Sequence, residues 1–288
     1  MFVFDKIKPL QTVIQEWKST GLRIGFVPTM GALHPGHISL VAEAHRQCDR
    51  VVCSIFVNPT QFNNPDDLKR YPRMPEADRS MLEQAGVHLL FTPDEQEIYP
   101  GELEKDNAPT IDLGRLEQVM EGSHRPGHFR GVVQVVSRLF DIVKPDVAFF
   151  GEKDFQQLAV IREMTRQLRL PVTIVGCPTL REPDGLAMSS RNLRLTTAQR
   201  QEAVAISRAL FYVRDNIAHV PVDELLFRAK EKIEASGQLR LEYLCLADEE
   251  TLEPVHPAHL PEHMRCCVAA WLGDVRLIDN VGIVLGES

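Results

Sequence analysis

The stretch RIGFVPTMGALHPGHISLVAEA (23–44) decides the fold, because a strand, a turn and a helix follow one another in it without a gap. Its apolar run 23–28 is typical of a strand buried in a sheet. Apolar residues then return with helical spacing at Ile38, Leu40, Val41 and Ala44. Between the two elements, Gly31 and Gly36 let the backbone approach a ligand closely. A strand, a glycine-bearing turn and a helix N-terminus in this order are typical of a phosphate site.

The same alternation continues along the first two-thirds of the chain. Four further apolar runs predict buried strands, at 50–57, 88–91, 146–150 and 172–176. Segments with helical spacing of apolar residues separate them. Continuous apolar strands that alternate with helices indicate a parallel sheet covered by helices on both faces. We therefore expect an α/β, Rossmann-like domain over residues 1–183.

The pattern changes after REPDG (181–185), and we expect a smaller α+β domain over residues 184–288. Residues 196–217 form one long helical pattern, with Thr196 or Thr197 as its N-cap. The remaining expected elements are a helix near 222–235 and short strands at 241–247, 265–272 and 275–281.

The composition argues against several classes of protein. The formal net charge of -8 and the pI of about 5.7 disfavour a nucleic-acid-binding protein, which normally presents a basic surface to phosphates. No apolar run is long enough to span a bilayer, and the N-terminus MFVFDKIKPL lacks the pattern of a secretory signal. The six cysteines show no CxxC spacing, so neither a disulfide framework nor a zinc site is expected. We expect a cytoplasmic protein.

His34 and His37, spaced as HxGH, flank the first turn. Each can donate a hydrogen bond to phosphate oxygens, and more strongly when protonated. The alternative is a tight turn with two surface histidines, but the pairing around a glycine favours a functional site. Neither GxxxxGK[ST] nor GxGxxG occurs, so nucleotide binding would depend on this turn.

The second strand ends in FVNPTQF (56–62), which places amide side chains at the carboxyl edge of the sheet. Ligands of open α/β sheets bind at that edge. Asn58 and Gln61 can donate and accept hydrogen bonds, which suits a substrate with hydroxyl and carboxylate groups. A loop stabilised by Asn/Pro turn chemistry is an equally good interpretation.

The segment EGSHRPGHFRGV (121–132) places Arg125, His128 and Arg130 in a glycine-containing loop before a helix. In an acidic protein this composition favours anion binding. A solvated basic loop is the alternative.

FFGEKDFQQL (149–158) repeats the arrangement of the first turn. A strand ends at Gly151, and a helix carrying Gln156 and Gln157 begins shortly after it. Lys153 is well placed to contact phosphate. In the alternative interpretation Asp154 is the N-cap of the helix and Lys153 lies in solvent.

REPDGLAMSSRNLRL (181–195) follows the fifth expected strand. Ser189, Ser190 and Arg191 offer two hydroxyls and a guanidinium on a glycine-containing loop, which could close over a triphosphate and stabilise departing pyrophosphate. The same segment links the two expected domains, so we also expect it to act as a hinge.

The HxGH turn resembles that of the HIGH-motif nucleotidyltransferase superfamily. Six blocks resemble the pantothenate synthetase family in order and spacing: PTMGALHPGH, FVNPTQF, YPR (71–73), RPGHFRGV, FGEKDFQQL and DGLAMSSRN. The similarity extends to VAAWLGDVRLIDN (268–280). This resemblance implies a two-step reaction, in which pantoate and Mg-ATP form pantoyl adenylate and pyrophosphate. The amine of β-alanine then displaces AMP and yields pantothenate.

The resemblance also implies the roles of individual residues. The implied ATP site comprises Met30, Gly31, Ala32, Leu33, His34, Pro35, Gly36, His37, Gly151, Glu152, Lys153, Asp154, Leu180, Met188, Ser189, Ser190 and Arg191. The implied pantoate site comprises Gln61, Gln157, Asn58, Arg125 and His128, with Gln61 also near β-alanine. The implied catalytic cations and donors are His34, His37, Lys153 and Arg191, with MSSR standing where distant superfamily members carry a KMSKS loop. The backbone at Leu180 would meet the adenine.

The resemblance further implies a homodimer and Mg²⁺ carried mainly by the phosphates, with no protein ligand that can be named. His124 matches no position of the family pattern. Two alternatives are another superfamily enzyme, such as a cytidylyltransferase, and a nucleotide-binding regulator without catalysis. Intact HxGH, GEKD and MSSR blocks argue against the regulator, because a sensor does not need cations beside pyrophosphate.

Overall fold

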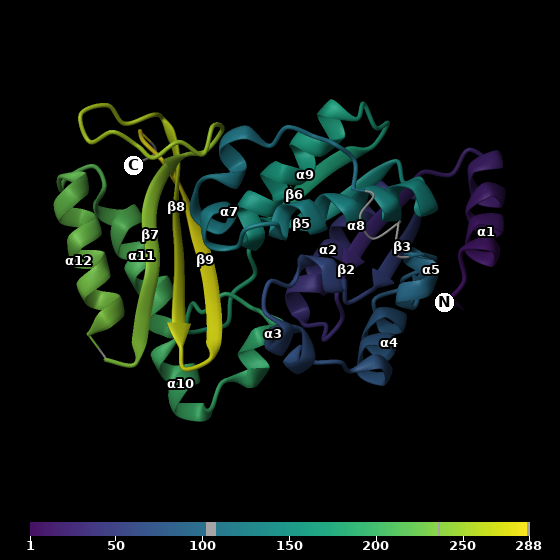
Figure 1. Cartoon of the computed structure of the whole chain (residues 1–288), viewed down its shortest axis with the longest axis horizontal. Helices are drawn as coiled ribbons and strands as arrows, with labels where there is room; N and C mark the ends of the chain where they lie inside the picture. The colour runs from purple at the N-terminus through teal and green to yellow at the C-terminus, as the bar shows by residue number, and fades with distance from the viewer. Residues whose placement is uncertain (102–107, 236, 287–288) are drawn as a thin grey trace. The chain divides into compact units, whose positions relative to one another are not determined.

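The computed structural model describes residues 1–101, 108–235 and 237–286 (Figure 1). The chain divides into two compact units, Met1–Pro178 and Thr179–Ser288.

The division lies at residue 178 instead of the expected 183. Arg181 explains the difference, because it forms a β-bridge with Ala187 and donates hydrogen bonds of 2.7 and 3.0 Å to the carboxylate of Asp279. The start of the REPDG segment is therefore part of the smaller unit and does not link the two.

The larger unit is built on a six-stranded sheet in which all the strand pairs are parallel. The strands lie in the order β1-β4-β3-β2-β5-β6. Their bounds are β1 Phe2–Phe4, β2 Ile24–Thr29, β3 Arg50–Ile55, β4 Leu89–Phe91, β5 Val147–Gly151 and β6 Thr173–Cys177. The five strands expected from the sequence are confirmed as β2 to β6, so the expected α/β class is confirmed as well.

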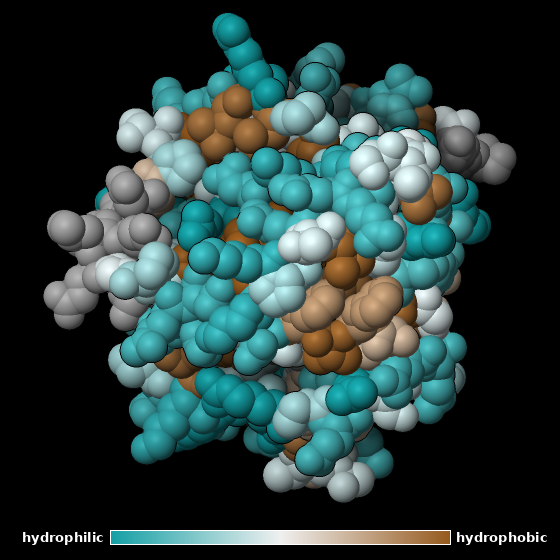
Figure 2. Space-filling view, turned by 90° about the vertical axis from the view of Figure 1, so that its right-hand side faces the viewer, coloured by the Kyte–Doolittle hydropathy of each residue, from teal (hydrophilic) through white to brown (hydrophobic). Residues whose placement is uncertain are grey.

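Strand β1 was not expected from the sequence. It is a three-residue edge strand that pairs only with β4, and its side chains at Phe2 and Val3 are exposed. Its sequence FVF is apolar, but a run of three residues is shorter than the runs on which the prediction of strands depended. Helix α1 spans Ile7–Ser19. The surface of the larger unit on the side of α1 is mostly hydrophilic, and its apolar areas are small (Figure 2).

Helices cover both faces of this sheet, because successive strand residues point to opposite sides. Phe26 packs with residues of α1, α8 (His128–Val143) and α9 (Phe155–Gln167), whereas Val27 packs with residues of α2 (Pro35–Gln47) and α4 (Pro75–Gln84). The shorter helices of this unit are α3 Pro65–Arg70, α5 Glu95–Ile98, α7 Met120–His124, η1 Pro59–Gln61, η2 Gly114–Glu117 and η3 Glu152–Asp154.

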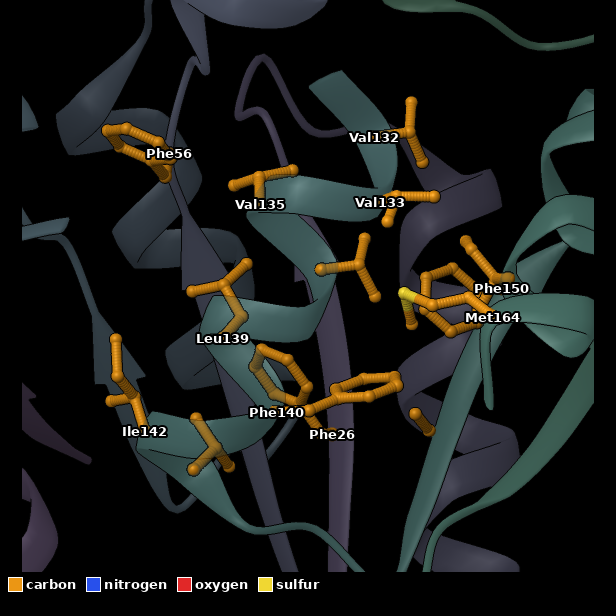
Figure 3. Packing of buried hydrophobic residues seen from close by; sticks show 14 of the residues in the cluster. Phe26, Phe56, Val132, Val133, Val135, Leu139, Phe140, Ile142, Phe150 and Met164 are labelled. Atoms are coloured by element: carbon orange, nitrogen blue, oxygen red, sulfur yellow. The ribbon is translucent and has the colours of Figure 1, made fainter. Parts of the chain in front are cut away.

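Helix α8 supplies much of the core on one face of the sheet. The ring of Phe140 meets Phe26 and Phe150 edge-on, with centroids 6.4 Å apart in both pairs (Figure 3). Edge-to-face contacts at this distance add to the stabilisation that comes from burying the rings. These contacts pack the C-terminal half of α8 against β2 and β5.

The smaller unit packs helices on an antiparallel sheet of order β7-β8-β9. Its elements are η4 Ser190–Arg194, α10 Thr197–Glu202, α11 Val204–Asn216, α12 Val222–Glu234, β7 Leu239–Asp248, β8 His263–Leu272 and β9 Val275–Val284. Residues of α11, α12 and the three strands share one apolar core. The expected α+β architecture is confirmed.

The single helix expected over 196–217 is two helices. Of the two expected N-cap candidates, Thr196 caps α10, and its hydroxyl accepts the Gln199 N–H at 3.3 Å. The chain tightens at Ala203, whose carbonyl accepts the Ile206 N–H at 3.2 Å. A one-residue interruption leaves the apolar spacing nearly unchanged, so periodicity could not reveal it.

Candidate active site

Three polar segments follow neighbouring strands at the carboxyl edge of the larger sheet. The turn 30–34 follows β2, η1 follows β3 and η3 follows β5, and β2 pairs with both of the other strands. The carboxyl ends of parallel strands meet at one edge, where ligands of open α/β sheets bind.

The turn after β2 does not present all its backbone amides to a ligand. The N–H of Ala32 donates to Asp78 Oδ2 at 2.9 Å, and the N–H of Leu33 donates to Asp78 Oδ1 at 2.7 Å. Ala32 and Leu33 are both buried. The turn is typical of a phosphate site by sequence, but the amides of these two residues are occupied by Asp78, a partner that the sequence analysis did not identify.

The two histidines of HxGH lie side by side at the start of α2. His34 is the N-cap of the helix, and the ring centroids of His34 and His37 are 4.1 Å apart. The backbone N–H of His34 donates to His37 Nδ1 at 3.3 Å, which places the proton of a neutral His37 on Nε2. His34 Nδ1 is buried without a hydrogen-bond partner in the described part of the chain. The pair thus retains hydrogen-bonding capacity for a ligand.

Both histidines are neutral in the free protein. Burial lowers the pKa of His34 to about 4, and the charge of Lys153 lowers it further while Asp154 opposes the shift. Burial lowers the pKa of His37 to about 3, with His34 and Lys153 adding to the effect. Near neutral pH neither histidine therefore carries the positive charge that would make it a stronger donor. The rings are neutral donors beside a cationic lysine.

We expect the ring signals of His34 and His37 in the free protein to stay unchanged between pH 8 and pH 5.5 in an NMR titration. Both groups bind their proton only near the pKa values of about 4 and about 3. Unfolded histidines titrate near 6.5, so in this window the unfolded chain binds more protons and acidification lowers the free energy of unfolding. Titration of either ring near pH 6.5, assigned through the His34→Ala and His37→Ala variants, would contradict the burial of the pair.

Asn58 supports the loop after β3 and is fully engaged within the protein. The side chain is 1% exposed, and its Nδ2 donates to the Gly131 carbonyl at 3.2 Å and to Thr60 Oγ1 at 3.0 Å. Its Oδ1 accepts from Tyr99 Oη at 3.1 Å. Asn58 therefore stabilises the turn, as the second interpretation of this segment proposed.

Gln61 keeps capacity for a ligand. Its Nε2 lies 2.9 Å from Met30 Sδ, and a thioether is a weak acceptor. Its Oε1 accepts from Asn58 Nδ2 at a long 3.4 Å. The side chain is 8% exposed, so a substrate that replaced these weak contacts would gain a well-oriented amide.

His128 and Arg125 hold the backbone of Gln61. His128 Nδ1 donates to the Gln61 carbonyl at 2.8 Å, and its Nε2 lies 3.2 Å from Arg125 Nη1. Burial lowers the pKa of His128 to about 4, and Arg125 adds to the shift. Arg125 Nη1 also lies 3.5 Å from Glu121 Oε2. A neutral buried histidine and an ion-paired arginine are not the solvated basic loop of the alternative, although Arg130 and His124 are exposed.

The turn after β5 places Lys153 beside the histidines. The Lys153 side chain is 16% exposed, and its Nζ lies 3.9 Å from Asp154 Oδ2. The alternative with Lys153 in solvent is therefore wrong. Asp154 occupies the N-cap position of α9, as the alternative interpretation proposed. Its side chain, however, makes no capping hydrogen bond.

The two glutamines of this turn differ in their surroundings. Gln156 is buried, with Oε1 accepting from the Glu121 N–H at 2.9 Å and Nε2 donating to the Leu116 carbonyl at 2.8 Å. Gln157 is half-buried, and its side chain makes no hydrogen bond to any residue that the structure describes. Gln156 is a structural residue, and Gln157 has its amide available.

Leu180 and the MSSR block (188–191) lie on one segment of the smaller unit. Leu180 is half-exposed, and its carbonyl accepts the Met188 N–H at 3.0 Å. The Ser189 hydroxyl accepts the Arg191 N–H at 3.3 Å and so caps η4, while Ser190 is buried. The two serine hydroxyls therefore differ: that of Ser189 caps η4, whereas Ser190 is buried.

No group of three or more histidine, cysteine, aspartate or glutamate side chains with the geometry of a metal site occurs among the residues that the structure describes. All six cysteines are free. No helix in residues 1–101, 108–235 and 237–286 combines the length and the apolarity needed to cross a membrane.

A parallel sheet with polar side chains gathered at its carboxyl edge defines a Rossmann-like α/β enzyme. Residues 2–282 match the family model described as pantoate-beta-alanine ligase, and the chain belongs to this family. It is therefore a ligase acting on pantoate and β-alanine.

Relatives and solved structures agree with this assignment. The chain is 48% identical to a pantothenate synthetase of Porphyromonas gingivalis, over 98% of this chain and 99% of that one. It is 50% identical to that of Paracoccus denitrificans, over 96% of both chains. The crystal structure of pantothenate synthetase from Thermus thermophilus superposes with a TM-score of 0.91 at 42% identity, covering 98% of this chain and 99% of that one.

Proposed function

We propose that the chain joins pantoate to β-alanine by two displacements, at a site built on the carboxyl edge of the larger sheet. In the first, a pantoate carboxylate oxygen attacks the α-phosphorus of ATP, and the bond to the bridging oxygen of pyrophosphate breaks. In the second, the neutral amine of β-alanine attacks the acyl carbon, the bond to AMP breaks and the nitrogen loses a proton. The observation that carries the proposal is the neutral His34–His37 pair beside Lys153, with His34 Nδ1 buried and unpartnered among the described residues.

The roles of the residues follow from their chemistry. His34, His37 and Lys153 offer donors and charge to the phosphates, and no protein nucleophile is required because positioning and electrostatics govern both displacements. Gln61 and Gln157 offer amides that suit the hydroxyls and carboxylate of pantoate. Asn58, Arg125 and His128 then act on pantoate indirectly, by holding η1 and the backbone of Gln61.

We assign the remaining members of the ATP set through the family motif. In the larger unit they are Met30, Gly31, Pro35, Gly36, Gly151, Glu152 and Asp154. In the smaller unit they are Leu180, Met188, Ser189, Ser190 and Arg191. In this proposal Arg191 neutralises pyrophosphate, and the smaller unit closes over ATP during the reaction.

A crystal structure supports ATP and β-alanine as ligands. The pantoate-beta-alanine ligase of Francisella tularensis, in a complex described as containing beta-gamma ATP and beta-alanine, superposes with a TM-score of 0.81 at 36% identity, covering 98% of this chain and 97% of that one. Mg²⁺ would enter as part of the substrate Mg-ATP. In this proposal phosphate oxygens, which suit this ion, hold most of its coordination sites.

The mechanism predicts pyrophosphate exchange without the second substrate. Labelled pyrophosphate should enter ATP when pantoate is present and β-alanine is absent, because the first displacement is reversible on the enzyme. Sustained release of AMP should begin only when β-alanine is added. An exchange that requires β-alanine, or release of ADP and phosphate, would show that no acyl adenylate is formed.

We also propose a cytoplasmic homodimer with no nucleic-acid or membrane partner. Six free cysteines are typical of a reducing compartment, and the acidic charge of -8 opposes binding to polyanions. Sedimentation equilibrium of the full chain would give the mass of the assembly directly.

A further inference from the structure

Asp78 is a buried carboxylate that the reaction scheme does not use. It lies in α4, is 2% exposed, and accepts the N–H groups of Ala32 and Leu33 at 2.9 and 2.7 Å. Among the described residues its carboxylate has no other hydrogen-bond or ion-pair partner. A buried carboxylate is unfavourable unless hydrogen bonds stabilise its charge, and here the turn after β2 supplies both of them.

The turn that Asp78 binds has an unusual backbone. Gly31 has a φ of 79° and Ala32 a φ of 49°, so two successive residues occupy the left-handed region. Such a conformation is unfavourable for alanine and persists only where the surroundings impose it. A Cβ on Gly31 would lie 2.9 Å from Ile55 Cγ2 and 3.0 Å from Asp78 Oδ2. The carboxylate is therefore packed against the turn as well as bonded to it.

The position of His34 depends on this turn. His34 directly follows Leu33, and its backbone N–H in turn donates to His37 Nδ1. Three successive backbone N–H groups are therefore bound by side chains: those of Ala32 and Leu33 by Asp78, and that of His34 by His37. A shift of the turn would move the histidine rings relative to Lys153.

We infer that Asp78 is a positioning residue for the HxGH pair, and that its carboxylate occupies the two turn amides that would otherwise be open to phosphate. Recognition of the triphosphate at this turn is thereby left to the side chains of His34, His37 and Lys153. This inference deepens the proposed function and rests on it for its catalytic consequence.

The first test needs no variant. In an NMR titration with a non-hydrolysable ATP analogue, the ring signals of His34 and His37 should shift strongly. The amide signals of Ala32 and Leu33 should shift little and should remain protected from hydrogen exchange. Large shifts of both amides, of the kind that a new phosphate hydrogen bond produces, would overturn the inference.

The second test is Asp78→Asn, which keeps the shape but turns an NH₂ group toward one of the two N–H donors. Pantoate-dependent pyrophosphate exchange should fall roughly tenfold to a hundredfold in kcat, as expected when catalytic groups are displaced by about 1 Å. The dissociation constant of pantoate should change less than twofold, and the histidine ring signals of the free protein should move.

Leu82→Ala is the matched control. Leu82 is fully buried in the same helix, and its truncation removes packing while leaving the two hydrogen bonds of Asp78 in place. It should lower stability without lowering kcat below the unfolding temperature. Equal losses of kcat in both variants, or unchanged histidine signals in Asp78→Asn, would overturn the inference. If the unmodified protein showed no exchange with pantoate, the proposed function would fail, and the histidine signals would still decide the role of Asp78.

Discussion

Replacing His34 or His37 by alanine is expected to lower pantoate-dependent pyrophosphate exchange by about 10² to 10³, the usual effect of removing one donor that stabilises transition-state charge. His37 loses a Nε2 proton oriented by the His34 amide, and His34 loses a ring whose Nδ1 has no protein partner in the described part of the chain. The double variant should lose less than the product of the single effects, because the rings lie 4.1 Å apart and act on the same phosphates.

His45→Ala is the control for this pair. His45 lies near the other end of α2, is exposed, and contacts the Ala85 carbonyl at 3.1 Å. Its removal should leave the exchange rate within twofold of the unmodified protein. Near-normal rates in both His34→Ala and His37→Ala, with circular dichroism showing folded proteins, would mean that HxGH serves only as a turn.

The parts of the fold that the sequence predicted are those whose signal is local. Strands β2 to β6 are mostly apolar because helices cover both faces of the sheet. Strand β1 is apolar as well, but its run FVF has only three residues and is too short to predict a strand. The compact units divide at residue 178, and the ion pair of Arg181 with Asp279, which places Arg181 in the smaller unit, joins residues 98 positions apart.

In the candidate site, too, the sequence predicted what has a local signal and missed what depends on distant residues. The histidines, Lys153, Gln61 and Gln157 could be proposed because they stand in short motifs directly after strands. Their division into ligand-facing and supporting residues depends on partners that are distant in the chain. Asn58 is engaged by Gly131 and Tyr99, and the turn amides are engaged by Asp78, 45 or 46 positions away. No spacing rule connects such residues, so only the three-dimensional structure could separate the two groups.

Gly131→Ala is expected to weaken pantoate binding tenfold to a hundredfold and to lower stability by about 1–3 kcal/mol. Gly131 lies in the first turn of α8, and an added Cβ would lie 2.5 Å from the Thr60 carbonyl oxygen and 2.8 Å from Gln61 Cα. Both atoms belong to backbone, so η1 itself must move. Alanine ordinarily favours a helix over glycine by roughly 1 kcal/mol, but here the steric overlap outweighs that gain.

Leu139→Ala separates loss of binding from loss of stability. Leu139 lies in the same helix and in the buried cluster of Figure 3, and its truncation should cost about 2–5 kcal/mol of stability through the cavity that it leaves. Its pantoate dissociation constant, measured by calorimetry below the unfolding temperature, should nevertheless stay near that of the unmodified protein, because η1 keeps its place. If Gly131→Ala bound pantoate normally while Leu139→Ala did not, the close approach of α8 to η1 would have no part in placing Gln61. The pantoate pocket would then have to be sought nearer the centre of α8.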